Sequence, residues 1–240
     1  MKIGIIQTRG LGDIIIAAPI ADYYISRGCT VYWPIDSDFI EAFQYAFPRI
    51  NFIPIDQSIT GKLTADYFYN EPSKQLKDLN CDAILCLYSF LTGFDFGYGN
   101  LKDAISFDAY KYAIAKVPFS EKWKIKIRRN AIREGQLFKT LNLNPNEIYS
   151  VIHDQGSVYS ANLDDFTPKE IRKIKIEPIT ENFLDWLGVL ENADSFYVIN
   201  SVYSNLIEQL NFPGKKHFFT QTTAAWTPVL INDWSYISNS

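Results

Sequence analysis

Short apolar segments alternate with longer amphipathic ones along nearly the whole of this sequence. The short segments are rich in Ile, Val, Leu, Phe and Tyr and predict buried β-strands at Lys2–Gln7, Thr30–Trp33, Asn51–Ile55, Asp82–Leu87, Ile148–His153, Ser195–Ile199 and Lys215–Phe219. The segments between them predict helices at Asp13–Arg27, Ser37–Phe47, Pro72–Leu79, Asp103–Lys116, Glu134–Leu141, Glu181–Glu191 and Tyr203–Leu210. This alternation is typical of βαβ units with parallel strands.

The alternation comes in two runs, which indicates two α/β domains. The segment Asn142–Asn146 (NLNPN) clusters Asn and Pro between two periodic regions and is the best candidate for a linker. We therefore expect two Rossmann-like parallel-sheet domains facing each other across a cleft, an N-terminal one over residues 1–143 and a C-terminal one over residues 147–240. A loop is expected over Thr92–Asn100, where glycines alternate with aromatic residues.

Composition excludes several classes of protein. Of 240 residues, 47% are hydrophobic and 21% charged, so the chain can bury a core and is not a disordered segment. The net charge of −4 argues against a mainly electrostatic nucleic-acid binder. A local basic run at Lys122–Arg133 (KWKIKIRRNAIR) leaves a nucleic acid or another anionic partner open, although a solvated helix face explains it more simply.

Targeting and cysteine patterns suggest a location. No apolar run approaches the roughly 20 residues of a membrane span, and no signal-peptide pattern opens the sequence. The three cysteines, Cys29, Cys81 and Cys86, are an odd number without metal-binding spacing. They predict free thiols of a reducing compartment, and we expect a cytoplasmic protein.

Ligands of open parallel sheets bind beyond the carboxyl ends of the strands, which marks loops 8–13, 154–160 and 200–204. In the first loop, Gly10 and Gly12 follow Arg9 and precede Asp13, between an expected strand and an expected helix. Glycines and the free N–H groups of a helix start allow close approach of an anion. Asp13 is expected to be either the helix N-cap or a carboxylate that accepts a proton from a hydroxyl nucleophile.

Two loops of the second half carry small polar residues. After the strand that ends at Ile199, Ser201, Ser204 and Asn205 lie at a helix start, where they either cap the helix or contact a diphosphate. After the strand that ends at His153, Gly156 and Ser157 form a candidate phosphate-binding turn.

Metal-binding patterns are weak in this sequence. Asp36-Ser37-Asp38 has the D-x-D spacing of some metal-dependent sugar transferases, but it directly precedes an expected helix, where capping explains it. The sequence contains no HExxH, CxxC, Walker or G-x-S-x-G pattern. We therefore expect no bound metal.

Two of these motifs occur in the order and spacing of a known family. The opening QTRGLGDIIIAAPIADYY, with Gly12-Asp13 and then Pro19, resembles the start of glycosyltransferase family 9, the ADP-heptose lipopolysaccharide heptosyltransferases. The helix–strand segment ending at Ile199, followed by Asn200-Ser201-Val202-Tyr203-Ser204-Asn205, resembles the family's donor-binding motif in degenerate form. Position 7, often Lys or Arg in that family, is Gln7. The chain resembles a short and divergent member.

The resemblance implies a GT-B architecture and an inverting transfer of sugar from a nucleotide-sugar to an acceptor hydroxyl. It assigns Asp13 as general base and places Arg9, Gly10 and Gly12 in the acceptor-side loop. It assigns donor binding to Gly156, Ser157, Ser201, Ser204 and Asn205. The nucleotide-sugar is then a co-substrate, no other cofactor is implied, and a glycan or another hydroxyl-bearing molecule is the acceptor.

Two other classes of protein stay open at this point. A non-catalytic nucleotide or nucleotide-sugar binding module fits the degenerate second motif. A nicotinamide-dependent oxidoreductase fits the Gly-containing first loop, but the third Gly of the dinucleotide fingerprint is missing.

Overall fold

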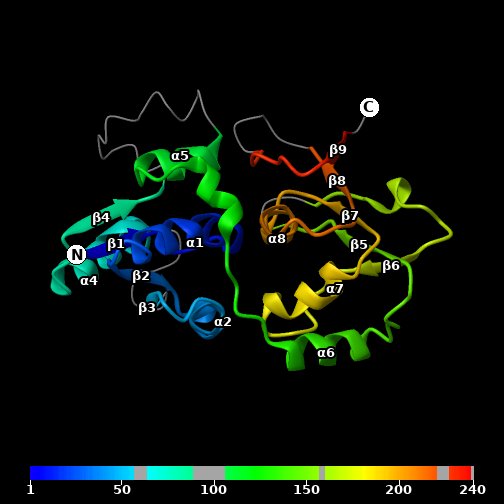
Figure 1. The fold of residues 1–240 in the computed structure, drawn as a ribbon, viewed down its shortest axis with the longest axis horizontal. Coiled ribbons are helices and arrows are strands. Elements are labelled where there is room, and N and C mark those ends of the chain that lie inside the picture. The colour runs from blue at the N-terminus through cyan, green and yellow to red at the C-terminus, as the bar shows by residue number, and fades with distance from the viewer. Residues whose placement is uncertain (57–63, 89–105, 157–159, 221–226, 239–240) are drawn as a thin grey trace. The chain divides into compact units, whose positions relative to one another are not determined.

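The computed structural model describes residues 1–56, 64–88, 106–156, 160–220 and 227–238. The chain forms two compact units (Figure 1). The first unit comprises Met1–Arg128 and Ala224–Val229, and the second comprises Arg129–Thr223 and Leu230–Ser240. The loop expected over Thr92–Asn100 lies outside the described residues.

The first unit is built on a four-stranded parallel sheet in the order β3-β2-β1-β4. Its strands are β1 (Lys2–Ile6), β2 (Thr30–Asp36), β3 (Asn51–Ile55) and β4 (Ala83–Cys86). Gly4 of β1 pairs with Tyr32 of β2 and with Ile84 of β4. Strand β1 is therefore paired on both sides, and the loop that follows it begins with the buried Gln7 and Thr8.

Helices cover this sheet. They are α1 (Leu11–Ile25), η1 (Ser37–Phe39), α2 (Ile40–Ala46), η2 (Asp66–Asn70), α4 (Glu71–Asp78), α5 (Phe107–Ile114) and η4 (Phe119–Lys124). Helix α1 packs against β2, α5 and η4, and α4 packs against β1 and β2. A Cβ on Gly4 would lie 2.7 Å from a methyl carbon of Leu76, so glycine is what allows α4 to approach β1 this closely.

The second unit is built on a five-stranded parallel sheet in the order β6-β5-β7-β8-β9. Its strands are β5 (Tyr149–His153), β6 (Arg172–Lys175), β7 (Ser195–Val198), β8 (Lys215–Phe219) and β9 (Trp234–Ile237). Its helices are α6 (Ala131–Thr140), η5 (Asp164–Phe166), η6 (Phe183–Trp186), α7 (Leu187–Glu191) and α8 (Val202–Leu210). Ile152, Leu163, Tyr197, Ile199 and Phe219 form a buried apolar cluster in this unit.

Two separate, wholly parallel sheets with helices confirm the expected fold class. Most of the expected strands and helices are present, with ends shifted by a few residues. Strand β9 was not expected, because the tail has no clear alternation. The segment Thr167-Pro168-Lys169-Glu170 has Thr, Pro and Glu in the order that predicts a helix start, but no helix begins there. The Thr167 hydroxyl instead donates to Leu163 O at 2.9 Å and closes the preceding turn.

The division into units falls between Arg128 and Arg129, not within the expected linker at residues 142–147. Helix α6 belongs to the second unit because it packs against α7 and η6. Its Arg133 guanidinium forms a two-pronged ion pair with Asp185, with N–O distances of 2.9 Å. The Asn-rich segment instead ends α6, with Asn142 in the left-handed region at φ 51°.

Among the residues that the structure describes, no helix is both long enough and apolar enough to cross a membrane.

Candidate functional site

The phenol of Tyr88, which follows β4, forms hydrogen bonds with the loop after β1. The Tyr88 hydroxyl lies 2.8 Å from Thr8 Oγ1 and accepts a hydrogen bond from Arg9 N at 3.0 Å. Burial raises the pKa of Tyr88, so the phenol stays protonated and can supply a hydrogen to Thr8. The loop backbone is thereby fixed where it leaves the sheet.

Gly10 determines where α1 begins. Its φ of 85° lies in the region that favours glycine, and α1 starts at the next residue, Leu11. Asp13 is therefore the third residue of the helix and not its N-cap, which corrects the capping alternative. The N-cap is Gly10, which provides no side-chain cap. A carboxylate in the first turn is still favoured by the helix dipole.

Asp13 forms an ion pair with a lysine from a distant helix. Lys111 of α5 places its Nζ 3.0 Å from Asp13 Oδ1 and donates to Gln7 Oε1 at 2.7 Å. The Lys111 side chain is buried, whereas the Asp13 side chain is 36% exposed. Arg9, Gly10 and Gly12 are also partly exposed, so the expected loop presents its polar groups to solvent.

Asp36 of the D-x-D pattern is a capping residue. Its carboxylate accepts from Asp38 N at 3.1 Å and caps η1, which confirms the capping interpretation for this residue. It also accepts from the Tyr67 hydroxyl at 2.9 Å and is 1% exposed. Burial, reinforced by the hydrogen bond to Asp36, raises the pKa of Tyr67.

In the second unit, the carboxyl ends of β5 and β7 lie side by side. His153 is in register with Val198, and Ile199 N donates to His153 O at 3.1 Å. The loops after these strands therefore leave the same edge of the sheet. A site shared by Gly156 and Ser201 needs this arrangement, because the two residues lie in these two loops. Gly156 is exposed, and Ser157 lies outside the described residues.

The start of α8 is a capping box. Ser201 Oγ accepts from Tyr203 N at 3.2 Å and from Ser204 N at 3.4 Å, while Ser204 Oγ accepts from Ser201 N at 3.0 Å. Asn205 donates to Ser201 O at 2.7 Å. Ser204 and Asn205 are fully buried, and only Ser201 is partly exposed. The three residues come together, and their side chains already shape the helix start.

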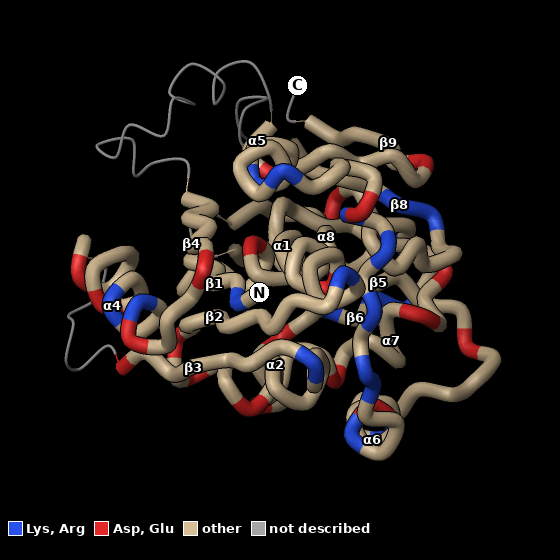
Figure 2. The backbone as a smooth tube through the Cα atoms, turned by 60° about the vertical axis from the view of Figure 1, so that its left-hand side comes forward, with Lys and Arg blue, Asp and Glu red and all other residues tan. Residues whose placement is uncertain are grey.

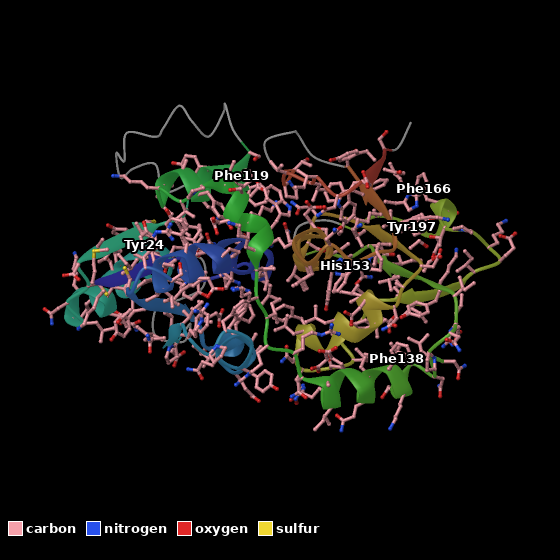
Figure 3. The ribbon with its side chains drawn as sticks, viewed as in Figure 1. Tyr24, Phe119, Phe138, His153, Phe166 and Tyr197 are labelled. Carbon is pink, nitrogen blue, oxygen red and sulfur yellow. The ribbon has the colours of Figure 1, made fainter. Side chains whose placement is uncertain are left out.

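His153 lies beside α8 in the second unit (Figure 3). Its ring meets that of Tyr203 edge-on, with centroids 4.8 Å apart, and its Nδ1 is buried without a hydrogen-bond partner among the described residues. Burial lowers the pKa of His153 to about 4, against a weaker opposing effect of Asp154. His153 is therefore neutral at physiological pH. Asp154 pairs with Lys175 at 2.7 Å.

The basic run at Lys122–Arg133 is largely used in internal ion pairs. The buried pair Lys122–Asp108 joins Nζ and Oδ2 at 2.6 Å. The other pairs of the run are Lys124–Glu121, Arg129–Glu134, Arg129–Glu191 and Arg133–Asp185. Figure 2 marks the basic and acidic positions along the backbone; the run itself contains no acidic residue, so all the carboxylate partners come from outside it. The run is therefore less available to an anionic partner than its composition predicts.

Sequence reasoning missed Lys111 and Tyr88. Lys111 lies in an amphipathic helix 98 residues after Asp13, and Tyr88 follows a strand, so no motif connects either to the first loop. The one signal in the sequence is that position 7 is the uncharged Gln7. The structure places the Lys111 ammonium beside this residue.

Comparison with known proteins identifies the fold. No family model and no curated protein sequence matches this chain. Among solved structures, a glycosyl transferase of family 9 from Veillonella parvula DSM 2008 matches with a TM-score of 0.66 and 10% identity, over 99% of this chain and 86% of that one. The fold is that of glycosyltransferase family 9.

Two further solved structures with a similar fold come from E. coli. ADP-heptose lps heptosyltransferase II matches with a TM-score of 0.60 and 10% identity, over 99% of this chain and 90% of that one. Heptosyltransferase WaaC with ADP-2-deoxy-2-fluoro heptose matches with a TM-score of 0.56 and 13% identity, over 99% and 93%. The family 9 fold thus covers both units of this chain.

Proposed function

We propose that this protein is a glycosyltransferase that moves a sugar from a nucleotide-sugar donor to an acceptor hydroxyl, with inversion at the anomeric carbon and without a divalent metal. The observation that carries the proposal is Asp13. Its partly exposed carboxylate lies in the first turn of α1, after the loop that follows the inner strand β1, in a family 9 fold. That is where a general base meets a ligand of a parallel sheet.

The donor side of the proposal rests on the second unit. The loop with Gly156 and the first turn of α8 leave the same sheet edge, and the positive end of the α8 dipole favours an anion there. WaaC, which has this fold, was solved with an ADP-sugar analogue. We place the donor diphosphate against Ser201 and the start of α8, with Ser204 and Asn205 holding the turn in shape.

Charge stabilisation without a metal follows from the same turn. Its side chains near the helix start, Asn200, Ser201 and Asn205, include no carboxylate that would hold a cation on the diphosphate. The positive end of the α8 dipole and the Ser201 hydroxyl can stabilise the charge that develops on the leaving group. Transfer activity should therefore persist in excess EDTA, and activity that returns only with Mg²⁺ or Mn²⁺ would contradict this part of the proposal.

The first experiment is a ligand screen. Thermal unfolding is measured with a panel of nucleotide-sugars, with the free nucleotides and with NAD. Stabilisation by one nucleotide-sugar and not by NAD, followed by sugar transfer to an acceptor, supports the proposal. Stabilisation without any turnover identifies a binding module, and stabilisation by NAD alone identifies the oxidoreductase alternative.

The second experiment changes the proposed base. Asp13→Asn keeps the size of the side chain but cannot accept the proton, and loss of a general base costs about 10²–10⁴ in rate. We expect kcat to fall by that factor while donor affinity changes little. Thermal stability should also fall, because the buried Lys111 loses its counter-charge, so turnover is compared at a temperature where both proteins are folded. Turnover at the wild-type rate in this variant would show that Asp13 is only a structural residue of the helix start.

A further inference from the structure

The Lys111 ammonium has three acceptors inside the first unit. Its Nζ lies 3.0 Å from Asp13 Oδ1, 2.7 Å from Gln7 Oε1 and 3.3 Å from Leu87 O. The ammonium donates hydrogen bonds to Gln7 and Leu87 and forms an ion pair with Asp13. Lys111 itself is 4% exposed. Its contacts are therefore with the protein, and one of them is the carboxylate proposed as the base.

The two oxygens of Asp13 have different surroundings. Oδ1 faces Lys111, whereas Oδ2 accepts no hydrogen bond within the described part of the chain. Oδ2 lies next to Gly10, where a Cβ would come within 2.5 Å of it. The absence of a side chain at Gly10 therefore leaves room for this oxygen. Lys111 therefore pairs with one oxygen of a carboxylate whose side chain is 36% exposed.

We propose that Lys111 is the positioning residue of Asp13, an inference that rests on the proposed function. The ammonium holds Oδ1, and this fixes Oδ2 to accept the proton of the acceptor hydroxyl. The hydroxyl oxygen forms a bond to the anomeric carbon as its proton passes to Oδ2. The bond from that carbon to the donor phosphate breaks, and its electron pair leaves with the nucleoside diphosphate.

A matched control exists in the same unit. Lys122 is also a fully buried lysine in an ion pair, with Asp108, and it makes no contact with Asp13 among the described residues. Lys122→Met therefore removes the same kind of group as Lys111→Met. Both variants lose the ion pair of a buried lysine and should lose thermal stability, Lys122→Met more so because Asp108 is fully buried and Asp13 is partly exposed. Only Lys111→Met should change the orientation of the Asp13 carboxylate.

The test compares the two variants at a temperature where both are folded. We expect kcat of Lys111→Met to fall by up to about 10²-fold, the scale of a misplaced reacting group, with KM for donor and acceptor within about twofold. Lys122→Met should keep kcat within about twofold. In the Asp13→Asn background, Lys111→Met should cause no further fall. An unchanged kcat, equal losses in both lysine variants, or a further fall in that background would overturn the proposal.

Two additions keep the proposal testable. Lys111→Gln retains a donor for Gln7 and is the variant to measure if Lys111→Met does not fold; the same fall in kcat is expected. If the wild-type protein transfers no sugar, the proposed function fails, and the positioning role is then examined by crystallography of Lys111→Gln. A displaced Asp13 carboxylate would support the role, and an unmoved one would overturn it.

Discussion

His153 shows how burial alone can give a single side chain a pH-dependent effect. Its pKa in the folded protein is about 4, below the ordinary value of 6.5. Between these two values the unfolded chain binds a proton that the folded protein does not. The contribution of His153 to stability is therefore complete above about pH 6.5 and is lost progressively as the pH falls toward 4.

We predict that His153→Phe flattens this pH dependence. From pH 7 to pH 5, His153 should reduce the free energy of unfolding by about 2 kcal/mol in the wild-type protein. Phe keeps an aromatic ring against Tyr203 and does not titrate. Urea unfolding at the two pH values measures the difference.

His217 provides the control for this prediction, since the sequence contains two histidines. Burial, helped by the charge of Lys215, lowers the pKa of His217 too, so it contributes in the same direction. In His217→Phe, the free energy of unfolding should still fall between pH 7 and pH 5 by the larger part of the wild-type amount. If the free energy of unfolding in both variants falls as much as in the wild-type protein, neither histidine causes the pH dependence.

The start of α8 combines a structural and a proposed binding role in one element. The capping box satisfies the N–H groups of Tyr203 and Ser204, while Ser201 itself remains partly exposed. Loss of an N-cap costs about 1 kcal/mol of stability. An effect of Ser201→Ala on donor affinity alone would therefore not separate the two roles.

We predict that Ser201→Asp separates the two roles. Asp is as good an N-cap as Ser and is favoured by the helix dipole, so the free energy of unfolding should stay near the wild-type value. Its negative charge would meet the donor diphosphate, and donor affinity should fall at least about tenfold, because like charges repel. Titration calorimetry with the nucleotide-sugar checks this. Unchanged affinity in the Asp variant would place the diphosphate elsewhere.

Across the whole molecule, the chain passes from one unit to the other immediately after Val229. Val229 N donates to Asp108 Oδ2 at 2.9 Å in the first unit. Ile231 N donates to Glu208 Oε1 at 2.8 Å in the second unit, where Trp234 Nε1 also donates to Glu208 at 2.6 Å. Two buried carboxylates thus hold amide groups only two residues apart, each within its own unit.

We predict that Asp108→Asn weakens the hydrogen bond that holds Val229 N and leaves the one that holds Ile231 N intact. The change leaves the Lys122 ammonium buried without its counter-charge, which costs about 3–5 kcal/mol. Hydrogen exchange should become faster at Val229 and stay slow at Ile231, which Glu208 still holds. Equal acceleration at both amides would show that the segment is released as one piece.

Local pattern predicted the elements of this fold well, because buried parallel strands and their helices leave a periodic trace in the sequence. The strands Asn51–Ile55 and Lys215–Phe219 were predicted to the residue. The local pattern gave a wrong prediction where the same residue types occur in two kinds of structure, such as helix ends and linkers. The segment NLNPN ends a helix and does not join the units, and Thr167 closes a turn instead of starting a helix. Strand β9 has no alternation to find.

The same difference holds at the site. Sequence alone determined that a Gly-punctuated loop with Asp13 follows the first strand, and that a polar turn follows Ile199, because turns and helix starts need particular local residues. Only the tertiary structure decided that Gly10 starts the helix, that Ser204 and Asn205 are buried, and that Lys111 reaches Asp13. These facts depend on which distant segments pack together, and contacts across 98 residues leave no local pattern in a single sequence.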